Sequence, residues 1–428
     1  MLEATAQRNG ELALSQPARQ ANIDAIAAHL RAGAKPACRA LGIELEHICV
    51  NDQGRPLTYS ESGGVRDVLK ALASDYPQVT MHDGDLLGVA RSGMTVTIEP
   101  AAQLELSAGP FESMADALRA FEGFEADVAR ALEPVGGRAL TLGYDPTMRA
   151  VDKELIPKAR YEFMNRYLSA VSPWGPRMMR GSASTQVSID YVDEADCIAK
   201  MRAAQALAPL FALMCDNAPV FEGVPRPHAL MRTEIWNGVD PDRCGAVPGM
   251  FDDGFGFDDY AAYLLDVPAI VAMDADGEAH YDTRTFGEIF ADRLMTGADV
   301  LHTMSMVFPD VRLKSYVEIR PADSMPVRYV VAYAALVKGL FYSEESLASV
   351  RRLVEGVSVA DVVDAKSALM EKGYRAQVYG RSVAELADTV IDLARSGLSV
   401  DERPFLEPLA QLVAARETLA DRAASNWG

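Results

Sequence analysis

The sequence predicts an α+β fold in which helices cover one side of a single antiparallel sheet and continue at the C-terminus. Between residues 41 and 144, short strand-like segments follow one another across tight turns, which favours antiparallel neighbours. Several of these segments alternate apolar with polar residues, as strands with one buried face do. From Val327 onward the pattern is almost entirely helical, so helices and strands are segregated along the chain.

The first half alternates short strands with amphipathic helices. The segment LGIELEHICV, residues 41–50, alternates apolar with charged residues and predicts a strand. Ser113 is a typical first residue of a helix, with Asp116 three residues later. In chain order we expect a helix over 21–34, strands over 41–50 and 56–60, a helix over 62–75, strands over 86–91, 94–98 and 103–107, a helix over 113–132, a strand over 138–144 and a helix over 158–169.

The second half adds three strands and a long core helix. The segments SASTQVSIDY and VRLKSYVEIR alternate polar with apolar residues, and the spacing of Arg232 and Glu234 favours a strand there too. A stretch rich in Gly, Asp and Phe predicts a mobile loop, which we expect to act as a lid. The expected elements are strands over 182–191, 228–236 and 311–320, a helix over 194–217 and the loop over 240–260.

Composition excludes some partners and leaves the domain count small. Of 428 residues, 49% are hydrophobic, and 41 basic against 61 acidic residues give a net charge of −20. An acidic protein repels polyanions, so we expect small-molecule partners and no nucleic acid. We expect a catalytic domain over 1–345 and a C-terminal helical extension over 346–428, packed on the same domain.

Nothing in the sequence predicts export or membrane insertion. There is no uninterrupted apolar run of spanning length, and the polar start MLEATAQRNGELALSQ lacks the apolar core of a secretory signal. The cysteines are scattered without a CxxC motif, which favours free thiols in a reducing cytoplasm, although a regulatory disulfide stays open. We therefore expect a cytoplasmic protein without a membrane partner, either a monomer or a homodimer.

Carboxylates gather on strands whose other residues are apolar or small. Glu44 and Glu46 are two positions apart on one strand, so their side chains share a face. Buried carboxylates that converge repel one another unless cations lie between them. An all-oxygen set of ligands suits Mg²⁺ or Mn²⁺ better than zinc. The carboxylates in question are Glu44, Glu46, Glu99, Glu105 and Glu318.

Basic residues share the later strands with these carboxylates. Arg232, Arg312, Lys314 and Arg320 suit phosphate or carboxylate groups, and beside carboxylate-held Mg²⁺ they are typical of nucleotide phosphoryl transfer. The alternative is a solvated sheet face with cross-strand ion pairs. Recurrence of the pattern on four separated strands favours the site. Because no Walker A motif occurs, a nucleotide would lie on the sheet surface.

Several segments resemble the plant-type glutamate–cysteine ligases, in the same order along the chain. The most specific are the motif Glu-Pro-x-x-Gln-x-Glu-Leu-Ser, the DPDR segment and VRLKxYxExR. The resembling segments include GIELEH (42–47), TIEPAAQLELSAGP (97–110), IPKARYEFM (156–164), MMRGSASTQVSIDY (178–191), RTEIWNGVDPDR (232–243) and FPDVRLKSYVEIRPADSMP (308–326).

The resemblance implies a fold and a reaction. The fold is a bent antiparallel sheet with helices behind it, similar to the catalytic domain of glutamine synthetase. In the implied reaction, the γ-carboxylate of glutamate attacks the γ-phosphate of ATP and forms a γ-glutamyl phosphate. The amine of cysteine then displaces phosphate to give γ-glutamylcysteine, the first step of glutathione biosynthesis. Water must be kept out, because it would hydrolyse the acyl phosphate.

Position by position, the resemblance also implies roles for individual residues. It implies metal ligands at Glu44, Glu46, Glu99, Glu105 and Glu318, ATP contacts at Gln186, Arg312 and Lys314, catalytic arginines at Arg232 and Arg320, and an amino-acid pocket at Lys158, Arg160 and Tyr161, with Gln103 beside the second carboxylate pair.

Three departures from the family pattern concern the substrate side. Ser188 stands where the family usually has Asn, Thr233 and Glu234 alter an Arg-Ser-x-Ile-Trp segment, and Pro321 replaces a Gly. The acceptor therefore stays open. The alternatives are a related carboxylate–amine ligase that uses another amine, and a non-catalytic relative that binds nucleotide or amino acid as a sensor.

Overall fold

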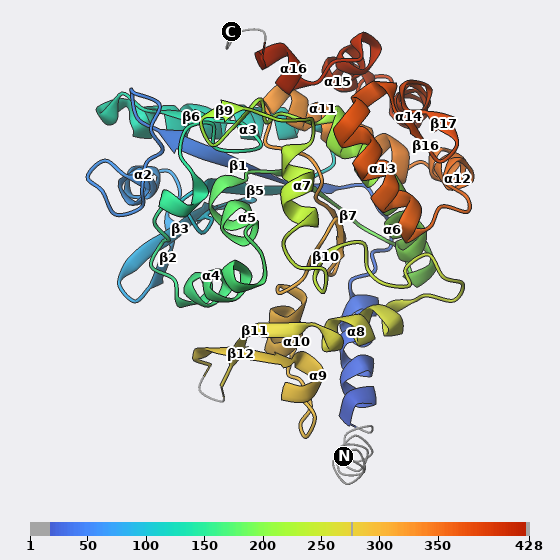
Figure 1. Cartoon of the computed structure of the whole chain (residues 1–428), viewed down its shortest axis with the longest axis horizontal. Coiled ribbons are helices and arrows are strands. Elements are labelled where there is room, and N and C mark those ends of the chain that lie inside the picture. The colour runs from blue at the N-terminus through green and yellow to red at the C-terminus, as the bar shows by residue number, and fades with distance from the viewer. Residues whose placement is uncertain (1–17, 275–276, 425–428) are drawn as a thin grey trace.

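The computed structural model describes residues 18–274 and 277–424, so the polar start MLEATAQRNGELALSQ lies outside the described residues. Within that range, nine strands form one antiparallel sheet (Figure 1). The strands in spatial order are β14 (Val311–Leu313), β15 (Val317–Ile319), β7 (Thr185–Ile189), β1 (Leu41–Val50), β5 (Leu104–Phe111), β4 (Met94–Ile98), β3 (Asp85–Arg91) and β2 (Gln78–His82), with β6 (Arg138–Leu140) also paired to β1.

The register of the sheet collects the polar residues on one face. Glu44 lies opposite Ser107 of β5 and Gln186 of β7, and Glu46 lies opposite Glu105. Side chains two residues apart on a strand share a face. The alternate residues of β1, such as Ile43 and Leu45, are at most 1% exposed and form the other, apolar face.

Three long helices cover the apolar face. They are α3 (Met114–Leu132), α6 (Glu194–Met214) and α11 (Val327–Phe341), which contact β5, β14–β15 and β1–β7 respectively. Ser113 caps α3 by accepting a hydrogen bond from the backbone N–H of Asp116 at 3.4 Å. The α+β fold with its helices behind a single sheet is therefore confirmed.

Helix α6 lies at the centre of the helical layer. Among the described residues it is the one helix long and apolar enough to cross a membrane by length and composition alone, although charged residues interrupt its apolar sequence. However, 89% of its most apolar window is buried inside the protein. That burial is typical of the core helix of a folded domain.

The segments between residues 257 and 304 form a separate layer with the helix over residues 18–32 (Figure 1). They comprise α8 (Phe257–Asp266), a hairpin of β11 (Pro268–Met273) and β12 (Ala279–Thr285), α9 (Phe286–Ile289) and α10 (Gly297–Met304). The hairpin packs on α4 (Ala159–Val171). This hairpin is not among the expected elements, because PAIVAM is uniformly apolar and AHYDTRT is largely polar, so neither alternates.

The C-terminal helices pack against α6 and α11. Gly339 of α11 allows a close crossing, because a Cβ there would lie 2.2 Å from the carbonyl oxygen of Ala394. The division of the chain at residue 345 stays a prediction. These helices are α12 (Glu344–Leu353), α13 (Val359–Lys372), α14 (Val383–Gly397), α15 (Arg403–Ala415) and α16 (Leu419–Ala424).

The remaining elements are short. They are α2 (Val65–Leu72), α5 (Gly175–Gly181), α7 (Met231–Asn237), the strand pairs β8 (Val220–Phe221) with β9 (Val224–Pro225), β10 (Cys244–Gly245) with β13 (Phe308–Pro309) and β16 (Gln377–Val378) with β17 (Arg381–Ser382), and 3-10 turns over Glu133–Val135, Ala150–Asp152 and Gly373–Arg375.

Three of the expected strands are wrong or incomplete. The segment 228–236 is not a strand, because helix α7 occupies most of it and places Arg232 and Trp236 one turn apart. The segment 311–320 is a hairpin, since Lys314 N–H donates to the carbonyl of Tyr316 and closes a turn inside the alternating pattern. Residues 56–60 contribute only one bridge, between Val50 and Pro56.

The segment 240–260 was expected to act as a lid. None of its residues, all of which the structure describes, lines the cavity described below. Arg243 is fully buried and bonds Asp240 and the carbonyls of Met306 and Pro268. The start of this segment therefore braces the core, and its end is helix α8.

Candidate functional site

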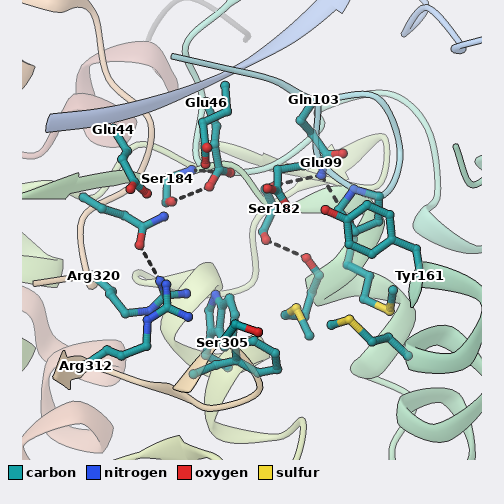
Figure 2. Close-up of a pocket in the computed structure, with 18 of the residues that line it drawn as sticks. Glu44, Glu46, Glu99, Gln103, Tyr161, Ser182, Ser184, Ser305, Arg312 and Arg320 are labelled. Carbon is teal, nitrogen blue, oxygen red and sulfur yellow. Dashed lines mark hydrogen bonds between the residues drawn. The ribbon is translucent and has the colours of Figure 1, made fainter. Parts of the chain in front are cut away.

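A cavity of about 330 Å³ lies over the polar face of the sheet. Residues of β1, β5, β7 and β14 form one side, and residues of α4, α5 and α7 contribute to its wall. Figure 2 shows Glu44, Glu46 and Glu99 across from Arg312 and Arg320. All but one of the expected site residues line it: Glu44, Glu46, Glu99, Gln103, Glu105, Lys158, Arg160, Tyr161, Gln186, Arg232, Arg312, Lys314 and Arg320. The exception is Glu318.

The four lining carboxylates are poorly neutralised. Within the described residues, the carboxylates of Glu44 and Glu99 have neither a hydrogen bond nor an ion pair. Glu46 accepts hydrogen bonds from the backbone N–H of Ser184 at 2.9 Å and from its hydroxyl at 2.7 Å. Over residues 18–274 and 277–424, Glu105 accepts hydrogen bonds only from the hydroxyls of Thr97 (3.1 Å) and Ser107 (3.3 Å).

Burial and mutual repulsion disfavour the charged forms of these carboxylates. Burial, then the charges of Glu105 and Glu318, raise the pKa of Glu44 to about 8. Burial, then Glu46, raise the pKa of Glu99 to about 7, and burial with Glu99 raises that of Glu105 to about 8. Burial also raises the pKa of Glu46, against the charge of Arg232. The nearby cations, such as Lys314 for Glu44 and Lys158 for Glu99, therefore offset burial and repulsion only in part.

Glu318 lies beneath this cavity and is bonded to three cations. Its carboxylate bonds Arg312 Nε at 2.7 Å, Arg320 Nη1 at 2.8 Å and Lys314 Nζ at 2.9 Å. Burial opposes its ionisation, but these cations together hold the pKa of Glu318 well below its usual range. Glu318 is therefore an anion that fixes a cationic patch facing the cavity.

Helix α7 adds Arg232 and Trp236 to the cationic wall. Arg232 donates from Nη1 to the carbonyls of Arg320 (3.1 Å) and Pro321 (3.2 Å). The guanidinium carbons of Arg232 and Arg320 each lie 5.6 Å from the Trp236 ring centroid. Arg320 also donates to the side-chain carbonyl of Gln186. The two arginines are thereby held side by side.

The opposite end of the cavity carries the residues that were expected to form an amino-acid pocket. Arg160 donates to the hydroxyl of Ser305 at 3.1 Å and to its carbonyl at 2.9 Å. Lys158 lies over the Tyr161 ring at 4.9 Å, and burial, then Arg160, lower the pKa of Lys158. Gln103 bonds the carbonyls of Met179 and Ser182, so it braces this wall.

Some lining residues were missed. Ser184, Trp236, Ser305 and Phe308, with three methionines of α4 and α5, border the cavity. Arg232 and Trp236 are four residues apart, which would place them on one face of a helix. Because the segment was interpreted as a strand, Trp236 was not expected beside Arg232. Ser305 follows α10, far away in the sequence, and only the fold brings it to Arg160.

A second cavity, of about 560 Å³, adjoins the first at Glu44, which lines both. Its floor continues the polar sheet face with small residues, namely Gly42, Ser107 and Ser188. Tyr316 and Arg91 also border it. A flat floor beside an aromatic ring suits a planar, largely apolar group.

The carboxylates fit a divalent cation, although they do not form a closed cage. Among the described residues, no three His, Cys, Asp or Glu side chains are grouped closely enough to hold one ion. Mg²⁺ commonly binds one or two carboxylates, water and substrate phosphates instead of an all-protein cage. The unpartnered oxygens of Glu44 and Glu99 suit that mode of binding.

Comparison with known proteins gives a consistent result. The sequence model of the family described as glutamate-cysteine ligase family 2 matches residues 40–423. The chloroplastic glutamate–cysteine ligase of Brassica juncea is 31% identical over 389 residues, which cover 87% of this chain and 75% of that protein. The chloroplastic enzyme of Arabidopsis thaliana is 30% identical over 379 residues, covering 86% and 72%.

A solved structure supports the same fold. The glutamate–cysteine ligase of Francisella tularensis, solved in complex with AMP, matches with a TM-score of 0.58 at 12% identity. The match covers 91% of this chain and 84% of that one.

Proposed function

This chain belongs to glutamate–cysteine ligase family 2, and from that premise we propose that it joins the γ-carboxylate of glutamate to the amine of cysteine at the expense of ATP. The observation that carries the proposal is the cavity in which partnerless carboxylates face a fixed cationic patch. Phosphoryl transfer needs positive charge around the transferring group.

ATP lies across the junction of the two cavities. The adenosine occupies the second cavity, against Tyr316 and the small side chains of the sheet. The triphosphate then points past Glu44 into the first cavity, where Arg312 and Lys314 bind it. Relatives whose names state ligation of glutamate and cysteine, and a similar fold solved in complex with AMP, support the use of ATP by this chain.

Glu44, Glu46, Glu99 and Glu105 would hold Mg²⁺, with Mn²⁺ as the alternative. When bound, the metal supplies charge neutralisation for the triphosphate and for the transferring phosphoryl group. The fit rests on the raised pKa values of Glu44, Glu99 and Glu105, because a nearby divalent cation favours their charged forms. Glu318 stays a predicted ligand, although its oxygens are bonded to basic side chains here.

The chain's own residues orient two successive steps. In the first, a γ-carboxylate oxygen of glutamate bonds to the γ-phosphorus as the bond to the β,γ-bridging oxygen breaks and ADP leaves. Arg232 and Arg320 bind the charge on the transferring group. In the second, the amine nitrogen attacks the acyl carbon, phosphate leaves with the bridging oxygen, and the departing phosphate takes up the proton that the nitrogen loses. Water has to be limited at this step, because it would otherwise take the place of the amine.

Lys158 and Arg160 bind the α-carboxylate of glutamate, while Met164, Met178 and Met179 receive the acceptor side chain. Thioether and aromatic walls suit a small, uncharged, polarisable group such as a thiol. This wall supports cysteine among the possible amines. A related ligase that uses another small amine is the alternative, because Ser188 and Pro321 depart from the family pattern.

The test is ADP release with glutamate, Mg²⁺-ATP and one amine at a time. We expect cysteine to stimulate ADP release above the glutamate-only rate, with γ-glutamylcysteine as the product by mass. Stimulation by another amine alone would move the assignment to the related ligase. ATP binding without turnover for any amine would indicate a non-catalytic relative.

A further inference from the structure

A buried lysine connects the C-terminal helices to the proposed catalytic arginines. Lys366 of α13 is 5% exposed and does not line the main cavity. Its ammonium group lies 2.7 Å from Asp310 Oδ2 and donates to Asn237 Oδ1 at 3.0 Å. Burial of an ammonium group is costly unless it is paired, so this position calls for an explanation.

The first contact leads to Arg320. Asp310 stands between β13 and β14, and its carbonyl accepts the backbone N–H of Arg320 at 3.0 Å. Its carboxylate also accepts from Gln205 of α6 at 2.9 Å. Burial would raise the pKa of Asp310, but Lys366 lowers it below its usual value. Lys366 is thus the main counter-charge of a carboxylate adjoining the cationic hairpin.

The second contact leads to Arg232. Asn237 is the last residue of α7, the short helix that carries Arg232 and Trp236. A cavity of about 20 Å³ behind the wall is lined by Lys366 together with Arg232, Trp236 and Arg320. The lysine therefore lies directly behind the two arginines, on the side away from the substrates.

We propose that Lys366 is a positioning residue, which sets Arg232 and Arg320 for the transferring phosphoryl group through its contacts with Asn237 and Asp310. The inference rests on the proposed function, and it gives the C-terminal extension a part in the reaction. A purely packing role would be met by an apolar side chain, which would bond neither Asp310 nor Asn237.

The test compares Lys366→Met with a matched control, Lys372→Met, in the full chain. Lys372 belongs to the same helix, but its side chain is 57% exposed. We expect kcat/KM for glutamate and for ATP to fall on the order of tenfold to a hundredfold in Lys366→Met, because small misplacement of catalytic groups has effects of that size. Lys372→Met should match the parent protein.

A double variant separates positioning from folding. Lys366→Met leaves Asp310 without its counter-charge, and Asp310→Asn removes that charge, so Lys366→Met/Asp310→Asn should recover thermal stability. Positioning predicts that kcat and KM stay impaired in the stable double variant. Parental kcat and KM in either folded variant would overturn the inference. A parent protein without ligase turnover would instead refute the proposed function.

Discussion

Glu105 is the direct neighbour of Glu46 on the adjacent strand, and two hydroxyl groups are the only donors to its carboxylate in the part of the chain that the structure describes. Its pKa of about 8 means that, without metal, it is mostly protonated at neutral pH. A glutamine has nearly the same shape as a protonated glutamate. Substitution at this position therefore separates charge from packing.

We expect Glu105→Gln to lower kcat by about two orders of magnitude, because removing one electrostatic stabiliser of a transition state has that effect. The free energy of unfolding without metal should stay equal or rise slightly, since most of Glu105 is already uncharged and only its small ionised fraction is lost. Steady-state ADP release and urea unfolding measure the two quantities. Glu122→Gln, on the exposed side of α3, serves as control. Parental kcat in Glu105→Gln would remove this residue from the site.

Single residues were predictable from the sequence where local spacing decides their direction. The i, i+2 spacing of Glu44 and Glu46 predicted their shared face, and the register confirms it. Ser305 was not predictable, since its approach to Arg160 depends on how α10 docks against α4. Metal binding by these residues stays a prediction.

Ion pairs hold the hairpin of β14 and β15 together. The carboxylate of Glu318 binds the basic side chains at positions 312, 314 and 320. The pairing of Arg312 with Glu318 across the hairpin places both charges on one face. Such an arrangement gives the cationic patch a fixed shape before substrate binds.

We expect Glu318→Gln to lower the free energy of unfolding by about 3–5 kcal/mol in metal-free buffer, because buried cations lose their counter-charge. Were Glu318 only a metal ligand, the same change would leave stability equal or raise it, as for Glu105. Urea unfolding with EDTA distinguishes the two results. Glu407→Gln breaks a surface ion pair with Arg395 and should change stability by at most about 1 kcal/mol.

The crossing of α11 and α14 gives a second test at this scale. We expect Gly339→Ala to cost about 1–3 kcal/mol of unfolding free energy, because its Cβ would overlap the backbone of Ala394. Gly123→Ala, in open space on α3, should gain about 0.5–1 kcal/mol from helix propensity. Urea unfolding of both variants checks the pair. Equal changes in unfolding free energy for the two variants would mean that α11 and α14 can move apart at little cost.

Helices and strands were predictable where their apolar residues repeat regularly over many residues. Helix α3 and strand β1 follow clear patterns, and both are present within a few residues of expectation. Helix α7 was mistaken for a strand because its seven residues span only two turns, too few for the 3.6-residue period to stand out. The β14–β15 turn was hidden, since the alternation continues through it.

The whole molecule should respond to pH through the raised pKa values of its cavity. Glu44, Glu99 and Glu105 bind protons more tightly when folded than the usual value of 4.5 allows when unfolded. The folded state then holds more protons between those values, so its stability falls as pH rises through the folded pKa values. The pKa of Glu318 is shifted in the opposite direction, downward. Its contribution to the free energy of unfolding is therefore lost only when the pH falls into the acid range.

We therefore expect the free energy of unfolding, with EDTA present, to decline from about pH 5 to about pH 8. Urea unfolding across that range measures the decline. Glu105→Gln should make it shallower, and Mg²⁺-ATP should flatten it. A stability that rises steadily across the range would contradict the assigned pKa directions.

The order of the strands and the two adjoining cavities could not be read from the sequence, because they depend on contacts between distant segments. The sheet class was predictable, since short turns impose antiparallel neighbours. The cytoplasmic location, the oligomeric state and the boundary at residue 345 stay predictions.

Helix α6 has a consequence for synthesis on the ribosome. Its apolar window reaches a mean hydropathy of 1.2, and much of its cover comes from helices that begin at Glu344 and end at Ala415. Translation at about 5–20 residues per second leaves α6 uncovered for roughly 10–40 s. We expect the nascent chain to depend on chaperones during that interval, when a membrane-like segment stands exposed.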